Sequence, residues 1–178
     1  MNQLEKDRVI IFIDHANIWH QLKKINGRID YIKFKNILSE GCHLVGALIF
    51  IGKSYIVSND KNKFYTYLKK AGYVIRNKSI LQTRNGKKKQ KGIDILIYRE
   101  ITELAEHESY DKCILVSGDA DFIDVVKKLK EKGITIEIWS FKISLSRKLI
   151  KEVGKENIHY IDDILDDIEY ISTNEIVL

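Results

Sequence analysis

One stretch decides the fold of this chain: Ile114-Leu115-Val116-Ser117-Gly118-Asp119-Ala120-Asp121-Phe122. Its apolar beginning is typical of a buried strand, and the Ser-Gly-Asp that follows is typical of a tight turn. From Asp121 onward, apolar residues recur at helical spacing. Asp119 and Asp121 are therefore expected where a strand passes into a helix. In an open parallel α/β sheet this is the edge where ligands bind, and two neighbouring carboxylates there favour a hard cation such as Mg²⁺.

The rest of the chain alternates predicted strands with predicted helices. We expect strands over 8–14, 44–51, 73–75, 112–117, 134–139 and 158–161, and helices over 15–25, 31–38, 59–71, 92–106, 121–132, 144–153 and 162–168. Residues 79–90 are polar and basic, and they predict a hairpin or loop. Helix 15–25 is expected to bury Ile18, Trp19, Leu22 and Ile25. This order predicts a three-layer α/β/α domain with a mostly parallel sheet.

Length and composition are those of one globular domain. The chain has 178 residues, 44% of them hydrophobic, which is enough to form a substantial core. Cys42 and Cys113 are its two cysteines, so a disulfide scaffold is excluded. No signal peptide or apolar run of membrane-spanning length is evident, and we expect a soluble, cytoplasmic protein.

Charge is distributed unevenly along the chain, whose formal net charge is +5. Residues 61–93 include eleven lysines and arginines and no acid, whereas residues 152–178 include eight acids and one lysine. One cationic face would suit a polyanion such as RNA. A solvated lysine-rich surface explains the same pattern equally well.

Four aspartates are the candidates for chemistry. Asp14 ends the first predicted strand, Asp119 and Asp121 follow the fourth, and Asp94 lies in the first turn of the helix after the basic loop. If the first and fourth strands are neighbours, their terminal carboxylates converge. A site of carboxylates without histidine or cysteine favours Mg²⁺ or Mn²⁺, and such a site is suited to metal-assisted hydrolysis of a phosphodiester.

Each candidate residue also has a structural explanation. Any one aspartate could cap a helix or complement its dipole, and only the shared position at one sheet edge favours chemistry. Asn17 could orient a water or a phosphate oxygen, or could serve as a capping amide. Glu100 lies six residues after Asp94, about 120° around an ideal helix, so we do not expect it to share the metal. Asp124 is similarly ambiguous.

Three motifs together resemble the signatures of NYN domains of the LabA-like group, in the PIN-like superfamily of metal-dependent nucleases. They are Phe12-Ile13-Asp14-His15-Ala16-Asn17, Lys91-Gly92-Ile93-Asp94-Ile95 and Val116-Ser117-Gly118-Asp119-Ala120-Asp121-Phe122. The resemblance implies a PIN-like, Rossmann-like domain, which we expect over residues 1–164. The acidic residues after it predict a C-terminal tail over 165–178. It also implies a sheet of order 3-2-1-4-5.

The resemblance further implies a ribonuclease, most simply an endonuclease. Mg²⁺ or Mn²⁺ would be bound near Asp14, Asp94, Asp119 and Asp121, with Asn17 at the site and RNA, single-stranded or structured, as the substrate. We assign substrate binding to Asn17, Ser117, Lys87, Lys88, Lys89 and Lys91. Tyr55, Phe64, Tyr65, Tyr67 and Tyr73 are interleaved with the lysines, and they could stack on bases or belong to the core. The protein could be a monomer or a homodimer.

Two other function classes remain open. The first is a non-catalytic RNA-binding or regulatory module with the same fold, although an acidic cluster without metal would repel phosphate. The second is a small-molecule phosphatase. A haloacid-type phosphatase would need an aspartate at position 16, where this chain has Ala16, and no phosphate-binding Walker loop is present. Toprim-like nucleases have a glutamate where this chain has Asp14.

Overall fold

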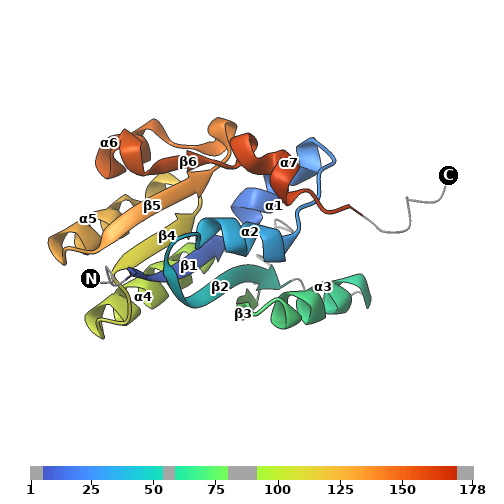
Figure 1. The fold of residues 1–178 in the computed structure, drawn as a ribbon, viewed down its shortest axis with the longest axis horizontal. Coiled ribbons are helices and arrows are strands. Elements are labelled where there is room, and N and C mark those ends of the chain that lie inside the picture. The colour runs from blue at the N-terminus through green and yellow to red at the C-terminus, as the bar shows by residue number, and fades with distance from the viewer. Residues whose placement is uncertain (1–5, 54–58, 80–91, 172–178) are drawn as a thin grey trace, which may run out of the picture.

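The computed structural model describes residues 6–53, 59–79 and 92–171 of the chain (Figure 1). Its strands are β1 (Arg8–Asp14), β2 (His43–Lys53), β3 (Val74–Ser79), β4 (Lys112–Val116), β5 (Thr135–Ser140) and β6 (Ile158–Tyr160). Its α-helices are α1 (His15–Lys24), α2 (Tyr31–Leu38), α3 (Asn59–Lys70), α4 (Ile93–Glu106), α5 (Ile123–Glu131), α6 (Arg147–Val153) and α7 (Leu165–Ile168). Four short 3₁₀ turns complete them: η1 (Ala120–Phe122), η2 (Lys142–Ser144), η3 (Lys155–Asn157) and η4 (Ile161–Ile164).

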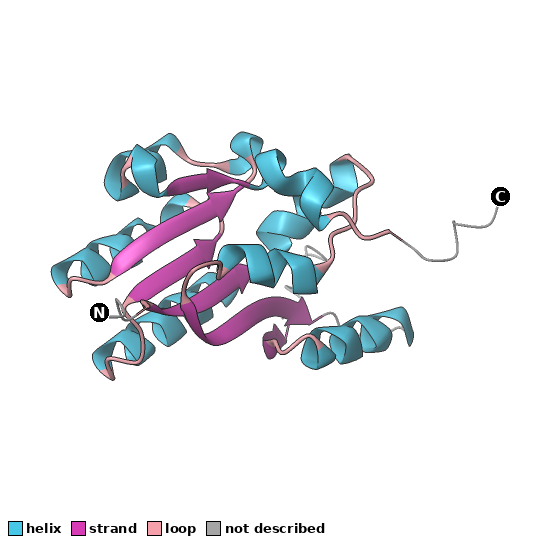
Figure 2. Cartoon of the chain, in the orientation of Figure 1, coloured by secondary structure: helices cyan, strands magenta, loops and turns pink. Residues whose placement is uncertain are grey.

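The strands form one parallel sheet of order β3-β2-β1-β4-β5-β6, with helices on both faces (Figure 2). The predicted α/β class and the order of the first five strands are confirmed, and the predicted edge strand is β6, which pairs with β5. β1 lies between β2 and β4. The chain crosses from β1 to β2 and β3 on one side, and later to β4 on the other. The carboxyl end of β1 is therefore the point where the winding of the sheet reverses.

Alternation along β1 separates the two layers of the core. Val9, Ile11 and Ile13 pack in a cluster with buried side chains of α1, α2, α3 and α7. Ile10 and Phe12 pack in a second cluster with α4, α5 and α6. All five side chains are almost fully buried, as expected of a central parallel strand that is covered on both faces. Because β1 is packed on both faces, the position of Asp14 at its carboxyl end is fixed at the edge of the sheet.

The burial predicted for α1 was partly wrong. Ile18 and Leu22 are buried, but Trp19 is 46% exposed and Ile25 is 56% exposed. Successive helical residues are separated by about 100° around the axis. Because α1 contacts the sheet only along a narrow stripe through Ile18 and Leu22, Trp19 lies at the margin of that stripe. The helix predicted from Asp121 also begins differently, because η1 precedes α5.

The segment after residue 164 packs against the domain. Ile168 in α7 is fully buried, and α7 lies against α2. The Asp30 amide donates a hydrogen bond to the Ile168 carbonyl (2.7 Å), and the Tyr170 amide donates one to the Arg28 carbonyl (3.1 Å). The packed part of the chain therefore continues to Tyr170, beyond the expected domain limit at residue 164.

Candidate active site

The carboxyl ends of β1 and β4 lie side by side. The two strands pair in parallel with Ile13 opposite Val116, so Asp14 and Ser117 are the next residues of each. A chain of hydrogen bonds joins them. Ser117 Oγ donates to Asp14 Oδ2 (3.2 Å), and the Asp119 amide donates to Ser117 Oγ (3.3 Å). The fold thus unites two motifs that are more than a hundred residues apart in the sequence.

Asn17 joins the same network from the first turn of α1. Its side-chain Oδ1 accepts a hydrogen bond from the Gly118 amide at 3.3 Å. The backbone of Asn17 also stabilises the ionised carboxyl of Asp14 by hydrogen bonding. Asn17 therefore links the start of α1 to the turn after β4, and its side-chain amide holds these two segments in a fixed relative position.

Gly118 is required by the close approach of a neighbouring loop. A Cβ at this position would lie 2.5 Å from Ser140 Oγ and closer still to the carbonyl oxygen of Ser144. The Gly118 carbonyl also accepts a hydrogen bond from the Ser146 amide (2.9 Å). The Ser-Gly-Asp turn is thus pressed against the segment between β5 and α6, which limits the positions that Asp119 can take.

Asp119 caps the following turn, and its charge also acts on Asp14. Its carboxylate accepts a hydrogen bond from the Asp121 amide (3.0 Å), so the predicted capping role is present. Burial raises the pKa of Asp14 most strongly, and the negative charge of Asp119 raises it further. Hydrogen bonds from the Asn17 backbone and the Ser117 hydroxyl act in the opposite direction but do not fully compensate.

The carboxylates lack a cationic partner within the described part of the chain. Among residues 6–53, 59–79 and 92–171, no lysine, arginine or histidine forms an ion pair with Asp14, Asp94, Asp119 or Asp121. A partly buried carboxylate beside a second anion is the environment that a hard divalent cation relieves. The carboxylate oxygens of Asp14 and Asp119 are donors of the type that Mg²⁺ and Mn²⁺ prefer.

The structure does not gather all four aspartates. Within the described ranges, no group of three histidine, cysteine, aspartate or glutamate side chains lies close enough to hold a metal ion. Asp94 is exposed in the first turn of α4, after Gly92 in the left-handed conformation (φ 103°). Asp121 is exposed in η1, and its amide contacts Asp119. These hydrogen bonds thus join Asp14, Asn17, Ser117 and Asp119, and Asp94 takes part in none of them.

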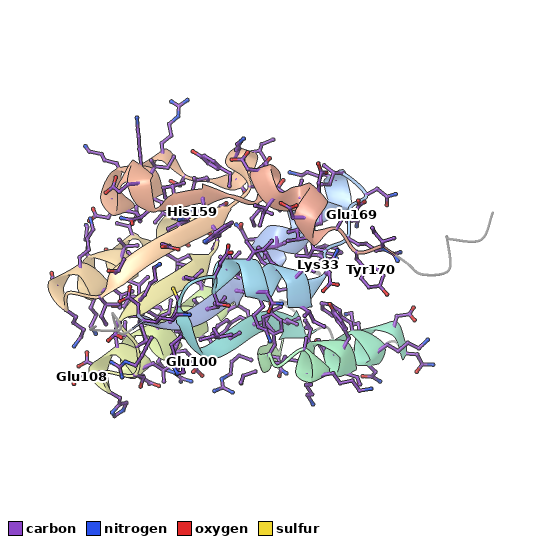
Figure 3. The ribbon with its side chains drawn as sticks, in the orientation of Figure 1. Lys33, Glu100, Glu108, His159, Glu169 and Tyr170 are labelled. Carbon is purple, nitrogen blue, oxygen red and sulfur yellow. The ribbon has the colours of Figure 1, made fainter. Side chains whose placement is uncertain are left out.

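Other predicted site residues have different surroundings. Ser117 is fully buried, and its hydroxyl is engaged by Asp14 and the Asp119 amide. Glu100, labelled on α4 in Figure 3, forms an ion pair with Arg76. Arg76 Nε donates a hydrogen bond to Glu100 Oε1 at 2.8 Å. Lys87, Lys88, Lys89 and Lys91 lie outside the described residues, and so does Tyr55.

The interleaved tyrosines belong mainly to the core. Tyr73 is buried, and its hydroxyl donates to the Tyr31 carbonyl (2.8 Å). The Tyr67 hydroxyl donates to Asp30 and accepts from the Tyr31 amide. His15 stacks among the same aromatic rings, and burial lowers its pKa to about 4, so it is neutral at pH 7.

Comparison with known proteins identifies the family. The NYN domain model matches residues 8–161. The chain belongs to the NYN domain family. NYN domains form part of the PIN-like superfamily, as the resemblance implied, whereas the match does not distinguish the LabA-like group.

A solved structure supports the same fold. A Vibrio parahaemolyticus protein of unknown function is similar to this NYN chain with a TM-score of 0.80 and 24% sequence identity, over 96% of this chain and 100% of that one. No match was found among curated proteins. No helix within the described residues is long and apolar enough to span a membrane.

Proposed function

We propose that this NYN protein is a metal-dependent ribonuclease that cleaves within RNA chains. NYN proteins are generally nucleases that act on RNA. The observation that carries the proposal for this chain is the coupling of Asp14 and Asp119 across the β1 and β4 ends, without a cationic neighbour among the described residues. An uncompensated anionic pair at the ligand-binding edge of an α/β sheet is costly unless a cation occupies it.

The roles of the residues follow from their contacts. Asp14 and Asp119 would hold Mg²⁺ or Mn²⁺, and Asp94 and Asp121 are proposed as further ligands from the neighbouring helix and turn. A bound divalent cation supplies a Lewis acid for a phosphate oxygen and lowers the pKa of a coordinated water. Ser117 orients the Asp14 carboxylate through the 3.2 Å hydrogen bond. Asn17 holds the Gly118 turn in place and can present its amide to substrate.

Basic residues would hold the substrate backbone. Helix α3 exposes Lys61, Lys63, Lys69 and Lys70, and the first two line one groove together with residues of α1. We assign Lys87, Lys88, Lys89 and Lys91 to phosphate contacts as well, because they extend the same basic run in the sequence. Cationic side chains that contact phosphates make binding salt-dependent without selecting a sequence.

The test is metal-dependent cleavage of a labelled single-stranded RNA. We expect cleavage in Mg²⁺ or Mn²⁺ and none in EDTA. Asp119→Asn keeps the size of the side chain but removes a metal-ligand charge, so its cleavage rate should fall more than about a hundredfold. Asp124→Asn, on the exposed side of α5, is the matched control and should cleave at the normal rate. Equal rates in Asp119→Asn and the control would refute the proposal.

One observation favours the second candidate, a non-catalytic RNA-binding module. Among the described residues, no third acidic, histidine or cysteine side chain lies close enough to Asp14 and Asp119 to complete a metal site. Such a module would bind RNA equally well with and without metal and would leave it intact. The cleavage assay therefore separates the two candidates directly.

A further inference from the structure

A groove of about 980 Å³ lies between α1, α3 and the chain that follows α7. Its wall on α1 is formed by His15, Trp19 and Lys23, which are four residues apart and so share one helix face. Figure 1 shows α1, α3 and the end of α7 at the edge toward which the strands β1 and β2 point. The groove therefore opens at the same edge of the sheet as Asp14.

Aromatic side chains in this groove are unusually accessible. Trp19 is 46% exposed, and Tyr170 is 47% exposed just past α7 (Figure 3). Phe64 and Tyr65 line the α3 side and are half-buried. Covering an exposed aromatic ring is favourable in water, and two half-exposed rings on one groove offer flat apolar faces to a ligand.

The groove is also cationic. Lys23, Arg28, Lys61 and Lys63 line it, and none of the described lining residues is acidic. Lys23 Nζ lies 5.0 Å from the centre of the Trp19 ring. This ammonium covers one face of the ring, so a base would stack on the opposite face. Rings for bases combined with cations for phosphates are the features of single-stranded nucleic-acid sites.

The acidic site and the groove meet only at the first turn of α1, where Asn17 contacts Gly118 and the opposite face of the helix lines the groove. His15 and Ala16 line it, and they directly follow Asp14 in the sequence. A strand with a phosphate at Asp14 and Asp119 would pass over the first turn of α1 to place its next nucleotides in the groove. This continuity links the groove to the reaction, whereas a groove elsewhere on the molecule would carry no such implication.

We propose that this groove is a base-stacking subsite for single-stranded RNA, in which Trp19 and Tyr170 each stack on an unpaired base. The proposal rests on the proposed ribonuclease function and narrows its substrate to unpaired RNA. In a duplex the base faces are already stacked inside the helix, so they cannot cover these two rings. Free bases can do so whatever their sequence, because every base has a π-face.

The two tryptophans give the experiment its signal. Trp139 is buried and stacks on His159 at 4.6 Å, so a change in fluorescence on adding ligand reports mainly on Trp19. The full-length protein is titrated in EDTA, where no cleavage occurs, with a ten-nucleotide single-stranded RNA. The same titration is made with its duplex and with an abasic strand that has the same phosphates. We expect the ordinary single strand to quench Trp19 fluorescence and to bind tightly, and the duplex and the abasic strand to do neither.

Substitutions then assign the contact. Trp19→Ala and Tyr170→Ala should each weaken single-strand binding roughly tenfold, because stacking on one base contributes that much affinity. Binding of these variants is measured by the fluorescence anisotropy of a dye-labelled strand, because the Trp19 variants lack the protein signal. Trp19→Phe should restore most of the loss, which a mere folding defect at this exposed site would not predict. Ile143→Ala is the matched control: Ile143 is 80% exposed in η2, outside the groove, and its variant should bind normally.

The outcomes separate the groove from the nuclease. Unchanged affinity in Trp19→Ala and Tyr170→Ala, or equal binding of abasic and ordinary strands, overturns the stacking proposal even if RNA is cleaved. A fluorescence change on deleting residues 172–178, with none on adding RNA, would assign the groove to the end of the chain itself and also overturn it. Stacking without any metal-dependent cleavage would refute the nuclease and leave the groove as an RNA site.

Discussion

The acidic site and the aromatic groove are neighbours, but they are built in opposite ways. The acidic site joins Asp14, Ser117 and Asp119 through a chain of hydrogen bonds, and it places like charges together. The groove leaves Trp19 and Tyr170 exposed, among cations. The first region has fixed geometry and unfavourable electrostatics, as chemistry on a phosphate requires. The second has open surfaces, as sequence-tolerant binding requires.

The largest expected effect separates chemistry from binding. Asp119→Asn should reduce RNA cleavage more than about a hundredfold. In EDTA the same variant should bind single-stranded RNA slightly more tightly than the native protein, because one negative charge that repels phosphate is gone. Cleavage is measured by gel electrophoresis and binding by Trp19 fluorescence. Parallel losses of cleavage and binding would show that the two regions are not separate.

The fixed geometry of the acidic site predicts a stability effect. Gly118→Ala should lower the free energy of unfolding by about 2 kcal/mol, because the new methyl group overlaps the Ser140 hydroxyl and the Ser144 backbone. Gly46→Ala in β2 is the control, since a Cβ there would meet only Leu48 Cδ1 at 3.9 Å. Urea unfolding of both variants measures the difference. Equal stabilities would mean that the loop at Ser144 yields easily.

The boundary of the acidic site can be tested at Asp94. If Asp94 on α4 supplies a further metal ligand, Asp94→Asn should lower cleavage roughly tenfold or more and raise the Mn²⁺ concentration needed for half-maximal rate. Glu103→Gln, exposed on the same helix, provides the comparison. An Asp94→Asn rate and metal requirement equal to those of Glu103→Gln would limit the site to Asp14, Asp119 and their neighbours.

The smallest expected effect concerns the electrostatic cost of the acidic site. The pKa of Asp14 is raised in the folded chain, chiefly by burial and then by Asp119, so its ionisation opposes folding. This cost is absent below the unfolded pKa near 3.8 and grows as pH rises through the folded pKa. Asp14→Asn should therefore unfold at a higher temperature than the native protein at pH 7, with the difference disappearing toward pH 3.5.

Added Mn²⁺ provides the control for this prediction. It should raise the unfolding temperature of the native protein at pH 7 but not that of Asp14→Asn, because only the native pair offers both charges to the ion. A native protein that is more stable than Asp14→Asn at pH 7 without metal would contradict the assignment of an uncompensated anionic pair.

Sequence patterns predicted the fold well where burial is continuous. The uninterrupted apolar run of β1 and the apolar stretch before Ser117 indicated central strands, and the order of five strands followed from the family resemblance. Prediction was wrong where a helix meets the sheet only along a narrow stripe. Trp19 and Ile25 are apolar, and nothing local distinguishes the margin of α1 from its buried face.

The sequence by itself determined the central strands, the turn at Gly118 and the placement of Asp14 and Asp119 at strand ends, because these depend on local patterns of apolar residues and turns. Only the tertiary structure decided that Asp14 is coupled to Asp119 through Ser117, that Arg76 pairs with Glu100, and that Ile168 joins the core. Only the tertiary structure, too, placed Trp19 and Tyr170 on one groove. These contacts join residues far apart in the chain, and their geometry is set by the packing of layers rather than by any local preference.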